Sequence, residues 1–393
     1  MRFRAAGNRV CFQGADSPVP QDRCMSESSA HSSASENPFF RLGWDNGWQD
    51  AWNLDPQLAE LVPARISMET KLNYLVCTAE GELPAKITGK LLHETKRTPL
   101  SRPKVGDWVG ISPIDNGTRA QIRGMLQRRS QLARKVVGRR NEGQVIAANV
   151  DSVFIVQGLD DNFNLRRLER CLVMVHEGGA LPIVLLNKTD LCSNLAERLT
   201  EARSVTGHAP IVCLSAKTGE HVDHLREWIR PGQSVAFIGS SGVGKSTLIN
   251  RIYGDVVQDT AEVRERDSKG RHTTVRREMI FLPEGGIVID TPGMREFHLW
   301  FADVGLEAAF SDIEEIALRC RFNDCTHVNE PDCAVLSAVE QGELERERHQ
   351  NYQRLQADLN KLNQAHRRRI WKDKASGSFQ KTRASRPHKK GGR

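Results

Sequence analysis

The feature that most constrains the fold of this chain is a glycine-rich segment between a short apolar run and a sequence of helical character. Its residues are Gly239, Ser240, Ser241, Gly242, Val243, Gly244, Lys245, Ser246 and Thr247. They match the phosphate-loop (P-loop) pattern G-x-x-x-x-G-K-[ST], in which backbone N–H groups and the start of the next helix bind phosphate. Lys245 is expected to reach the β- and γ-phosphates, and the Ser246 hydroxyl is expected to bind Mg²⁺. The segment predicts a strand–loop–helix unit that binds a nucleoside triphosphate.

The sequence around this loop alternates between apolar strands and helical segments. Strands are predicted at residues 151–156, 181–186, 210–214 and 234–238, a helix at 164–177, and a hairpin at 278–289. This alternation is typical of a mostly parallel sheet with helices on both faces. We therefore assign residues 141–302 to an α/β P-loop domain.

A second motif indicates which base the nucleotide carries. It consists of Asn187, Lys188, Thr189 and Asp190, directly after a predicted buried strand. The Asp190 carboxylate can accept from the N1–H and the exocyclic amine of guanine, and adenine lacks both donors. Asn187 would support the loop and the base edge, and the Lys188 stem would cover the ring. Ser215, Ala216 and Lys217, after the next strand, would offer backbone donors to the guanine carbonyl.

Two further segments are expected to complete the phosphate end of the site. Asp290 begins the sequence Asp-Thr-Pro-Gly, so its carboxylate can hold Mg²⁺ through water and the Gly293 N–H can sense the γ-phosphate. Thr274, in a charged loop at 270–274, is the expected switch residue that binds Mg²⁺ only when γ-phosphate is present, with Thr273 as the alternative.

The residue after Gly293 bears on catalysis. Met294 stands where many GTPases have a glutamine, and an apolar side chain cannot orient the attacking water. We therefore expect slow intrinsic hydrolysis that needs an activator. His272 is the candidate for the water-orienting group or base, and a purely structural histidine in the switch loop is the competing interpretation.

The order of these motifs is unusual. The base motif at 187–190 and the Ser215–Lys217 segment precede the P-loop, whereas in ordinary GTPases they follow it. This order predicts a circularly permuted domain, which is possible because the termini of a compact α/β domain can lie close together. One consequence is that the second switch leads directly into the residues after about 300.

A cluster of metal-binding side chains lies in that C-terminal part. Cys320, Cys325, His327 and Cys333 supply three thiolates and one imidazole within a short stretch. Four such ligands satisfy tetrahedral Zn²⁺ and leave no open position, so the site would be structural. A disulfide or redox site is the weaker alternative, because three cysteines leave one unpaired. We expect residues 303–366 to form a helical zinc-binding domain, with helical periodicity over 335–366.

The rest of the chain divides into three parts. Residues 66–140 read as about five short strands, including an alternation at Lys86, Thr88 and Lys90, and predict a small barrel of the oligonucleotide-binding (OB) kind. Residues 1–65 form an extension that is expected to be largely disordered, with an aromatic segment at 38–62 that either packs as an arm or binds through its rings. Residues 367–393 form a basic tail.

Charge favours a polyanionic partner. The net charge is +7, and the barrel carries many basic residues, which either contact nucleic acid or form a solvated face. The basic residues of the barrel are Arg97, Arg102, Lys104, Arg119, Arg123, Arg128, Arg129, Arg134 and Lys135.

Together these motifs resemble the bacterial ribosome small-subunit-dependent GTPases over residues 66 to 365. The segments that carry the resemblance are Val105–Val109, 151–157, 187–190, 239–247, 270–274, 290–297 and the Cys/His cluster. The resemblance implies a GTPase that binds the 30S subunit and its 16S rRNA late in maturation, hydrolyses GTP when the subunit stimulates it, and then leaves. It also implies Mg²⁺ with GTP, one structural Zn²⁺, a cytoplasmic location, a monomer and no membrane partner.

Two other functions remain open from the sequence. One is a zinc-stabilised rRNA-binding adaptor in which GTP is only structural. The other is a permuted GTPase of the large subunit, although such relatives generally lack both the barrel and the Cys/His cluster. After residues 270–274 this chain has Val275, where the resembled family often has another threonine. The resemblance therefore does not decide which threonine binds Mg²⁺.

Overall fold

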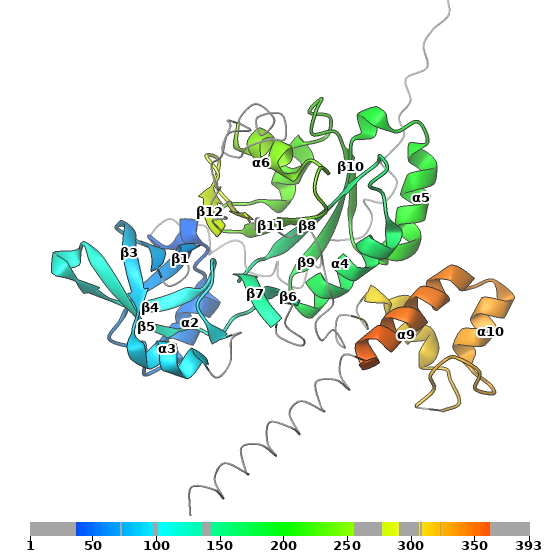
Figure 1. Cartoon of the computed structure of the whole chain (residues 1–393), viewed down its shortest axis with the longest axis horizontal. Coiled ribbons are helices and arrows are strands. Elements are labelled where there is room, and N and C mark those ends of the chain that lie inside the picture. The colour runs from blue at the N-terminus through cyan, green and yellow to red at the C-terminus, as the bar shows by residue number, and fades with distance from the viewer. Residues whose placement is uncertain are drawn as a thin grey trace, which may run out of the picture.

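The computed structural model describes residues 37–70, 73–96, 101–135, 143–254, 277–290, 306, 309–322 and 324–361. In this part of the chain a barrel, an α/β domain and a group of helices follow one another along the molecule (Figure 1). This arrangement confirms the predicted fold class. The expected terminal disorder, the switch loop at 270–274 and the residues after Asp290 in the Asp-Thr-Pro-Gly motif lie outside the described residues.

The barrel consists of five strands that close on themselves. The strands are β1 (Val62–Thr70), β2 (Asn73–Thr78), β3 (Gly81–Ile87), β4 (Trp108–Ile114) and β5 (Arg119–Met125). They pair in the order β1-β2-β3-β5-β4, and a β1–β4 pairing closes the ring. Only β3 and β5 are parallel. This is the partly Greek-key order of an OB barrel.

One strand prediction in the barrel is wrong at its end. The alternation through Thr88 and Lys90 was expected to be extended, but β3 ends at Ile87 and helix α3 spans Gly89–Lys96. The Leu92 N–H donates to the Thr88 carbonyl at 2.9 Å, so the chain has already turned into the helix there. Alternating polar residues do not specify a strand when no apolar face accompanies them.

The α/β domain contains a mostly parallel sheet, as predicted. Its strands are β8 (Ser152–Gly158), β9 (Leu181–Asn187), β10 (Ile211–Leu214), β11 (Ser234–Ile238), β12 (Arg277–Phe281) and β13 (Ile287–Asp290). Their order is β10-β9-β8-β11-β13-β12, and only β12 runs antiparallel to its neighbour. Every residue of β8 and β11 is buried, as central strands covered on both faces require.

Helices cover both faces of this sheet. Helices α4 (Leu165–Glu177) and α5 (Leu195–Thr206) pack in one apolar cluster with Val153 and Ile155 of β8. Helix α6 (Lys245–Tyr253) packs in another with Phe154 and Val156, the alternate residues of the same strand. Short 3₁₀ helices follow two of the strands, at Thr189–Leu191 and Asp223–Trp228.

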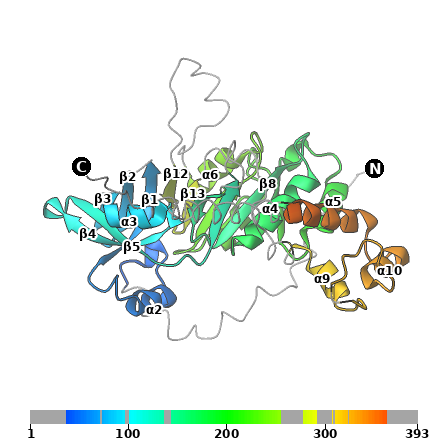
Figure 2. The same ribbon diagram turned by 60° about the horizontal axis from the view of Figure 1, so that its bottom comes forward.

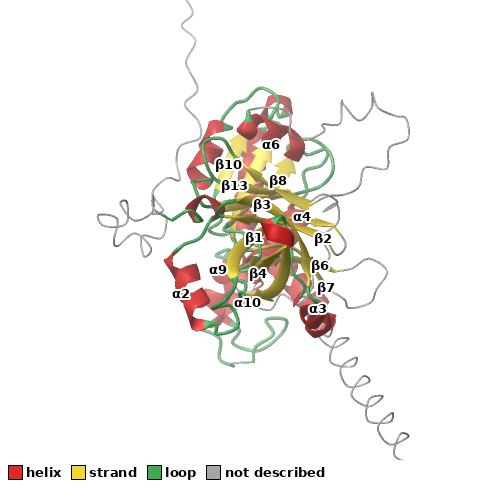
Figure 3. Cartoon of the chain, turned by 90° about the vertical axis from the view of Figure 1, so that its left-hand side faces the viewer, coloured by secondary structure: helices red, strands yellow, loops and turns green. Residues whose placement is uncertain are grey.

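The barrel and the α/β domain are joined through their strands. Strand β1 pairs antiparallel with β12, with Met68 opposite Glu278 and Glu69 opposite Arg277, so one sheet runs through both units. A two-stranded ribbon, β6 (Gln131–Lys135) and β7 (Gly143–Ala148), forms a separate sheet between them in the chain. Figure 3 shows α2 (Asn46–Leu54) and α3 on the outside of the barrel strands.

The aromatic segment packs on the barrel as an arm. A 3₁₀ turn (Phe40–Leu42) and helix α2 (Asn46–Leu54) carry Trp44, Trp48 and Trp52 into a cluster with Trp108 of β4. The Trp44 and Trp108 rings meet edge-on with centroids 4.6 Å apart. These rings are therefore part of a core, and the alternative that they project for binding does not hold for these three tryptophans.

The C-terminal helices pack beside α4 and α5 (Figure 2). They are α9 (Ser311–Ala317), α10 (Ala334–Gln341) and residues 346–361. The predicted helical periodicity over 335–366 is divided between two helices, because Gly342 takes a left-handed conformation (φ 77°) that ends α10. Within the described residues no helix is long and apolar enough to cross a membrane.

Candidate nucleotide and metal sites

The P-loop lies between β11 and α6, as its sequence predicts. Lys245 is the first residue of α6, and its Nζ donates to the carbonyls of Gly239 at 2.9 Å and Ser240 at 2.7 Å. The ammonium group is thus held over its own loop, where phosphates would meet it. Ser246 follows, half-buried in the first helical turn.

Asn187 ties three loops together. Its side chain is buried, its Nδ2 donates to the Val243 carbonyl at 2.7 Å, and its Oδ1 accepts from the Ala216 N–H at 2.8 Å. Gly244, at φ 99°, passes so close that a Cβ there would lie 2.3 Å from Asn187 Nδ2. The structure therefore brings together the base motif, the P-loop and the Ser215 loop, which are distant in the sequence.

The Asp190 carboxylate is oriented by a neighbouring loop. Ser215 Oγ donates to Asp190 Oδ1 at 2.6 Å and accepts from the Thr218 N–H at 3.1 Å. Thr189 Oγ1 donates to Glu220 Oε2 at 3.3 Å, which links the same two loops again. Because one carboxylate oxygen of the exposed Asp190 side chain is held by this hydrogen bond, the orientation of the carboxylate is fixed, which suits a bidentate acceptor.

Lys188 has a partner that the sequence motifs do not include. It adopts a left-handed conformation (φ 71°), and its Nζ lies 2.5 Å from Asp160 Oδ2, just after β8. Burial raises the pKa of Asp160, but the hydrogen bond and charge of Lys188 outweigh it, so the pKa lies below its ordinary value. Asp160 is therefore an ionised member of this edge of the sheet.

Two arginines outside every motif also contact the site loops. Arg167, in the first turn of α4, donates from Nη1 to Ser240 Oγ at 2.9 Å. Arg251, near the end of α6, donates to the Ala216 carbonyl at 2.8 Å and to the Lys217 carbonyl at 2.7 Å. No sequence signal marked either residue, because each lies in a helix whose spacing explains only its buried face.

Asp290 ends β13 at the same edge of the sheet as the P-loop. Its strand is the parallel neighbour of β11, with Ile289 opposite Ala236, so both chains leave the sheet side by side. This is the edge at which α/β sheets bind ligands. The remaining predicted residues of the phosphate end, Thr274, His272 and Gly293, lie outside the described residues.

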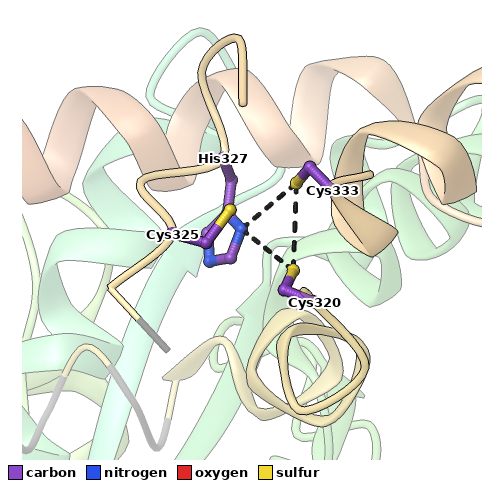
Figure 4. Close-up of side chains that lie close together, drawn as sticks. All are labelled: Cys320, Cys325, His327 and Cys333. Atoms are coloured by element: carbon purple, nitrogen blue, oxygen red, sulfur yellow. Dashed lines mark hydrogen bonds between the residues drawn. The ribbon is translucent and has the colours of Figure 1, made fainter. Parts of the chain in front are cut away.

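The Cys/His cluster is assembled at the C-terminal helices (Figure 4). The ligand atoms of Cys320, Cys325, His327 and Cys333 all lie within 4.8 Å of one another. Cys320 Sγ is 3.9 Å from Cys333 Sγ and 3.6 Å from His327 Nδ1, and the Nδ1-to-Cys333 distance is 3.4 Å. Ordinary zinc bond lengths in a tetrahedron place sulfurs about 3.7 Å apart and sulfur and nitrogen about 3.5 Å apart. The four side chains therefore fit zinc.

The surroundings of Cys320 and His327 favour the same ligand. Burial raises the pKa of the Cys320 thiol, but backbone hydrogen bonds from Val335 and Ala334 outweigh it, so the pKa is below its ordinary value. Burial also lowers the pKa of His327, which favours the neutral imidazole that a metal needs. His349 Nε2 and Gln353 Nε2 lie 2.9 and 2.7 Å from the His327 carbonyl, so helix 346–361 fixes the loop.

Comparisons with known proteins agree with this geometry. A family model described as RsgA GTPase matches residues 125–300, and one described as 50S ribosome-binding GTPase matches residues 234–369. "Small ribosomal subunit biogenesis GTPase RsgA 2" of Lactiplantibacillus plantarum is 47% identical over 287 residues, 73% of this chain and 80% of the relative. The RsgA protein of Opitutus terrae is 43% identical over 327 residues, 81% of this chain and 88% of the relative.

Solved structures show the same similarity. YjeQ from Thermotoga maritima aligns with a TM-score of 0.56 and 27% identity, covering 76% of this chain and 98% of that one. A structure described as YloQ, a circularly permuted GTPase, aligns with a TM-score of 0.55 and 25% identity over 78% of this chain and 98% of that one.

Proposed function

The chain belongs to the RsgA family of small ribosomal subunit biogenesis GTPases, and from this premise we propose a role in late 30S maturation. In that role the protein binds the small subunit, the subunit stimulates GTP hydrolysis, and hydrolysis releases the protein. The relatives' names support the GTPase activity and the subunit. The 16S rRNA as the contact, the monomeric state and the cytoplasmic location are our extensions of the same proposal.

The observation that carries the proposal is the position of Asn187. Its two hydrogen bonds connect the P-loop and the Ser215 loop although the motif order is permuted. A guanine nucleotide would have its phosphates at the P-loop and its base between Asp190 and the Ser215–Lys217 segment. Lys188 would cover the ring, and Thr189 would brace the two base loops through Glu220.

We assign the phosphate end by the same logic. Residues 239–247 would enclose the phosphates, with Lys245 neutralising charge and Ser246 and Thr274 holding Mg²⁺. Asp290 would bind the ion through water, Gly293 would contact the γ-phosphate, and His272 would orient the attacking water. GTP with Mg²⁺ supplies the reacting phosphoryl group, and the chain supplies the charge that stabilises it.

The other units would serve RNA binding and attachment. We propose domains at 66–140, 141–302 and 303–366, flanked by the 1–65 extension and the 367–393 tail, with a structural Zn²⁺ on Cys320, Cys325, His327 and Cys333. In the barrel, Lys104, Arg128 and Arg129 pair with Glu69, Asp107 and Asp45. Arg119 and Arg123 on β5 are exposed, and the pair of Arg119 with Asp115 is exposed on both sides, so these two arginines are better candidates for rRNA contact.

The test is GTP turnover with purified ribosomal subunits added separately. We expect the 30S subunit to stimulate phosphate release, with little effect of the 50S subunit and none on ATP. Stimulation by the 50S subunit alone would favour the large-subunit function, and binding without stimulation by either would favour the adaptor.

A substitution at Asp190 lets the same assay test recognition of the guanine base. Asp190→Asn places an amide donor where guanine carries its amine, so GTP turnover should fall and XTP turnover should rise, because xanthine has an oxygen at that position. Unchanged preference for GTP would remove Asp190 from base recognition.

A further inference from the structure

Arg251 connects the helix of the P-loop to the loop that would face the base. Its Nε and Nη2 donate to two successive carbonyls, those of Ala216 and Lys217, at 2.8 and 2.7 Å. The loop has room for this clamp only because residue 219 is glycine: its φ is 92°, and a Cβ there would lie 2.5 Å from Arg251 Nη1. The planar guanidinium thus fixes the orientation of two peptide groups at once.

Fixing the Ala216 carbonyl also fixes the next N–H. A trans peptide group is planar, so its N–H points opposite to its C=O. With the Ala216 carbonyl turned toward Arg251, the Lys217 N–H must point away from that side chain, and the clamp sets its direction.

The Lys217 N–H is the open donor of this loop. The N–H groups of Ser215, Ala216, Thr218 and Gly219 donate to Glu220 O, Asn187 Oδ1, Ser215 Oγ and Ser215 O. Within the described residues the Lys217 N–H has no such acceptor. A backbone donor held in place at a ligand site without an internal partner is poised to donate to the ligand.

We propose that Arg251 is a positioning residue for base recognition, which aims the Lys217 N–H at the exocyclic oxygen of guanine. This inference rests on the proposed GTP-binding function and adds the residue that sets selectivity at position 6 of the purine. Asp190 reads the N1–H and the amine at position 2, whereas the Arg251-clamped N–H reads the acceptor at position 6. Adenine carries an amino group there, so a fixed donor repels it.

The test separates position 6 from position 2 of the base. Dissociation constants would be measured for GDP, 6-thio-GDP and IDP by competition with N-methylanthraniloyl-GDP, using the full chain and the variants Arg251→Met and Arg226→Met. Sulfur in 6-thio-GDP is a weak acceptor at position 6, and IDP lacks only the amine at position 2. Arg226, which pairs with Glu284 in the same domain, is the matched control.

Arg251→Met is expected to weaken GDP binding roughly tenfold, the effect of losing about one well-placed hydrogen bond. The preference for GDP over 6-thio-GDP should shrink toward one, while the preference for GDP over IDP stays at the wild-type value. In subunit-stimulated turnover KM should rise and kcat should stay the same. Arg226→Met should change none of these quantities.

Two results would overturn the proposal. One is an Arg251→Met protein with an unchanged 6-thio-GDP preference, and the other is an equal loss of both preferences, which would mean that Arg251 only supports the fold of the pocket. Should Arg251→Met fail to fold, Arg251→Lys keeps the charge but cannot span both carbonyls, so the same selective loss is expected at smaller size. Failure of the underlying function is distinguishable, because wild-type protein would then not bind GDP.

Discussion

The α/β domain has two neighbours, and each junction is centred on a buried arginine with different kinds of partner. At the barrel, the acceptors of Arg65 among the described residues are neutral oxygens, those of Gly106 at 3.1 Å, Asn149 at 2.8 Å, Ser234 at 3.3 Å and the Leu42 carbonyl. It therefore ties the arm, the barrel and β11 together without a direct ion pair. Burial lowers the pKa of Arg65 to about 10, so it remains charged at neutral pH.

At the C-terminal helices the central arginine, Arg348, has carboxylate partners as well as neutral ones. Arg348 donates to both Asp312 oxygens at 3.1 and 2.9 Å, and its Nη1 is 3.9 Å from Glu169 Oε1 of α4. It also donates to the Val205 and Ala309 carbonyls. Burial raises the pKa of Glu169 to about 7, although Arg348 and Asn351 oppose this.

The difference indicates how each unit can move. The barrel junction combines a shared sheet with an arginine that donates to neutral acceptors, so pH and salt should affect it less and the two units should behave as one body. Across the C-terminal junction Arg348 donates to the Val205 carbonyl and lies 3.9 Å from Glu169, whose charge changes near neutral pH, so this junction is sensitive to pH. It is therefore the joint that can loosen, and it lies next to the helix whose first turn contacts the P-loop through Arg167.

Removal of the proposed metal should produce the largest difference between the two junctions. Structural zinc contributes about 10 kcal/mol or more to the folding of small domains, so chelation or Cys333→Ser should unfold the C-terminal helices. Hydrogen exchange should then become fast at residues 346–361 and remain slow in β1 and β12. Simultaneous loss of protection in the barrel would show that the two junctions are not independent.

Arg65→Met should have the next largest effect. It leaves several buried oxygens without a donor, which we expect to cost about 3–5 kcal/mol in the free energy of unfolding. Urea denaturation followed by tryptophan fluorescence measures it, since Trp108 lies 5.5 Å from the guanidinium. The control is Arg119→Met on the exposed face of the barrel, and similar losses for both variants would contradict a special role for Arg65.

Arg348→Met should cost less, about 2–3 kcal/mol, because the acceptors it leaves can recover. The Asp312 side chain is 44% exposed and can be hydrated, and Glu169 can take up a proton. Calorimetry with hydrogen exchange at 346–361 measures the change, with Arg321→Met, whose pair with Asp332 is exposed, as control. A loss as large as that of Arg65→Met would remove the distinction between the two junctions.

Glu169→Gln should give an effect that depends on pH. Because the pKa of Glu169 is about 7 in the folded protein and 4.5 is its ordinary value, the folded state binds the proton more tightly. Its contribution to stability is therefore present below about pH 4.5 and is lost as the pH rises through 7. Between pH 5 and pH 8 the wild type should lose about 2.5 kcal/mol more than Glu169→Gln in urea titrations. If the free energy of unfolding changes with pH by the same amount in both proteins, Glu169 does not contribute to the pH dependence of the C-terminal junction.

Local motifs were predictable where a short stretch of sequence dictates its own conformation. The P-loop, the strand before it and the Cys/His cluster are each recognised from one short, continuous segment of sequence. The OB barrel and the parallel sheet followed from the periodicity of apolar residues. The helix at Gly89–Lys96 was missed because Lys86, Thr88 and Lys90 carry no apolar pattern that excludes it.

The sequence alone indicated the chemistry available to this protein: a phosphate loop, a carboxylate at Asp190 and a set of three cysteines and one histidine. The tertiary structure decided which of these groups meet. It placed Asn187 between two loops, turned Arg251 onto the Ser215 loop, and paired Lys104, Arg128 and Arg129 of the barrel with acids. The reason is that a side chain's type fixes its possible partners, whereas strand order and burial fix which partner lies within hydrogen-bonding distance.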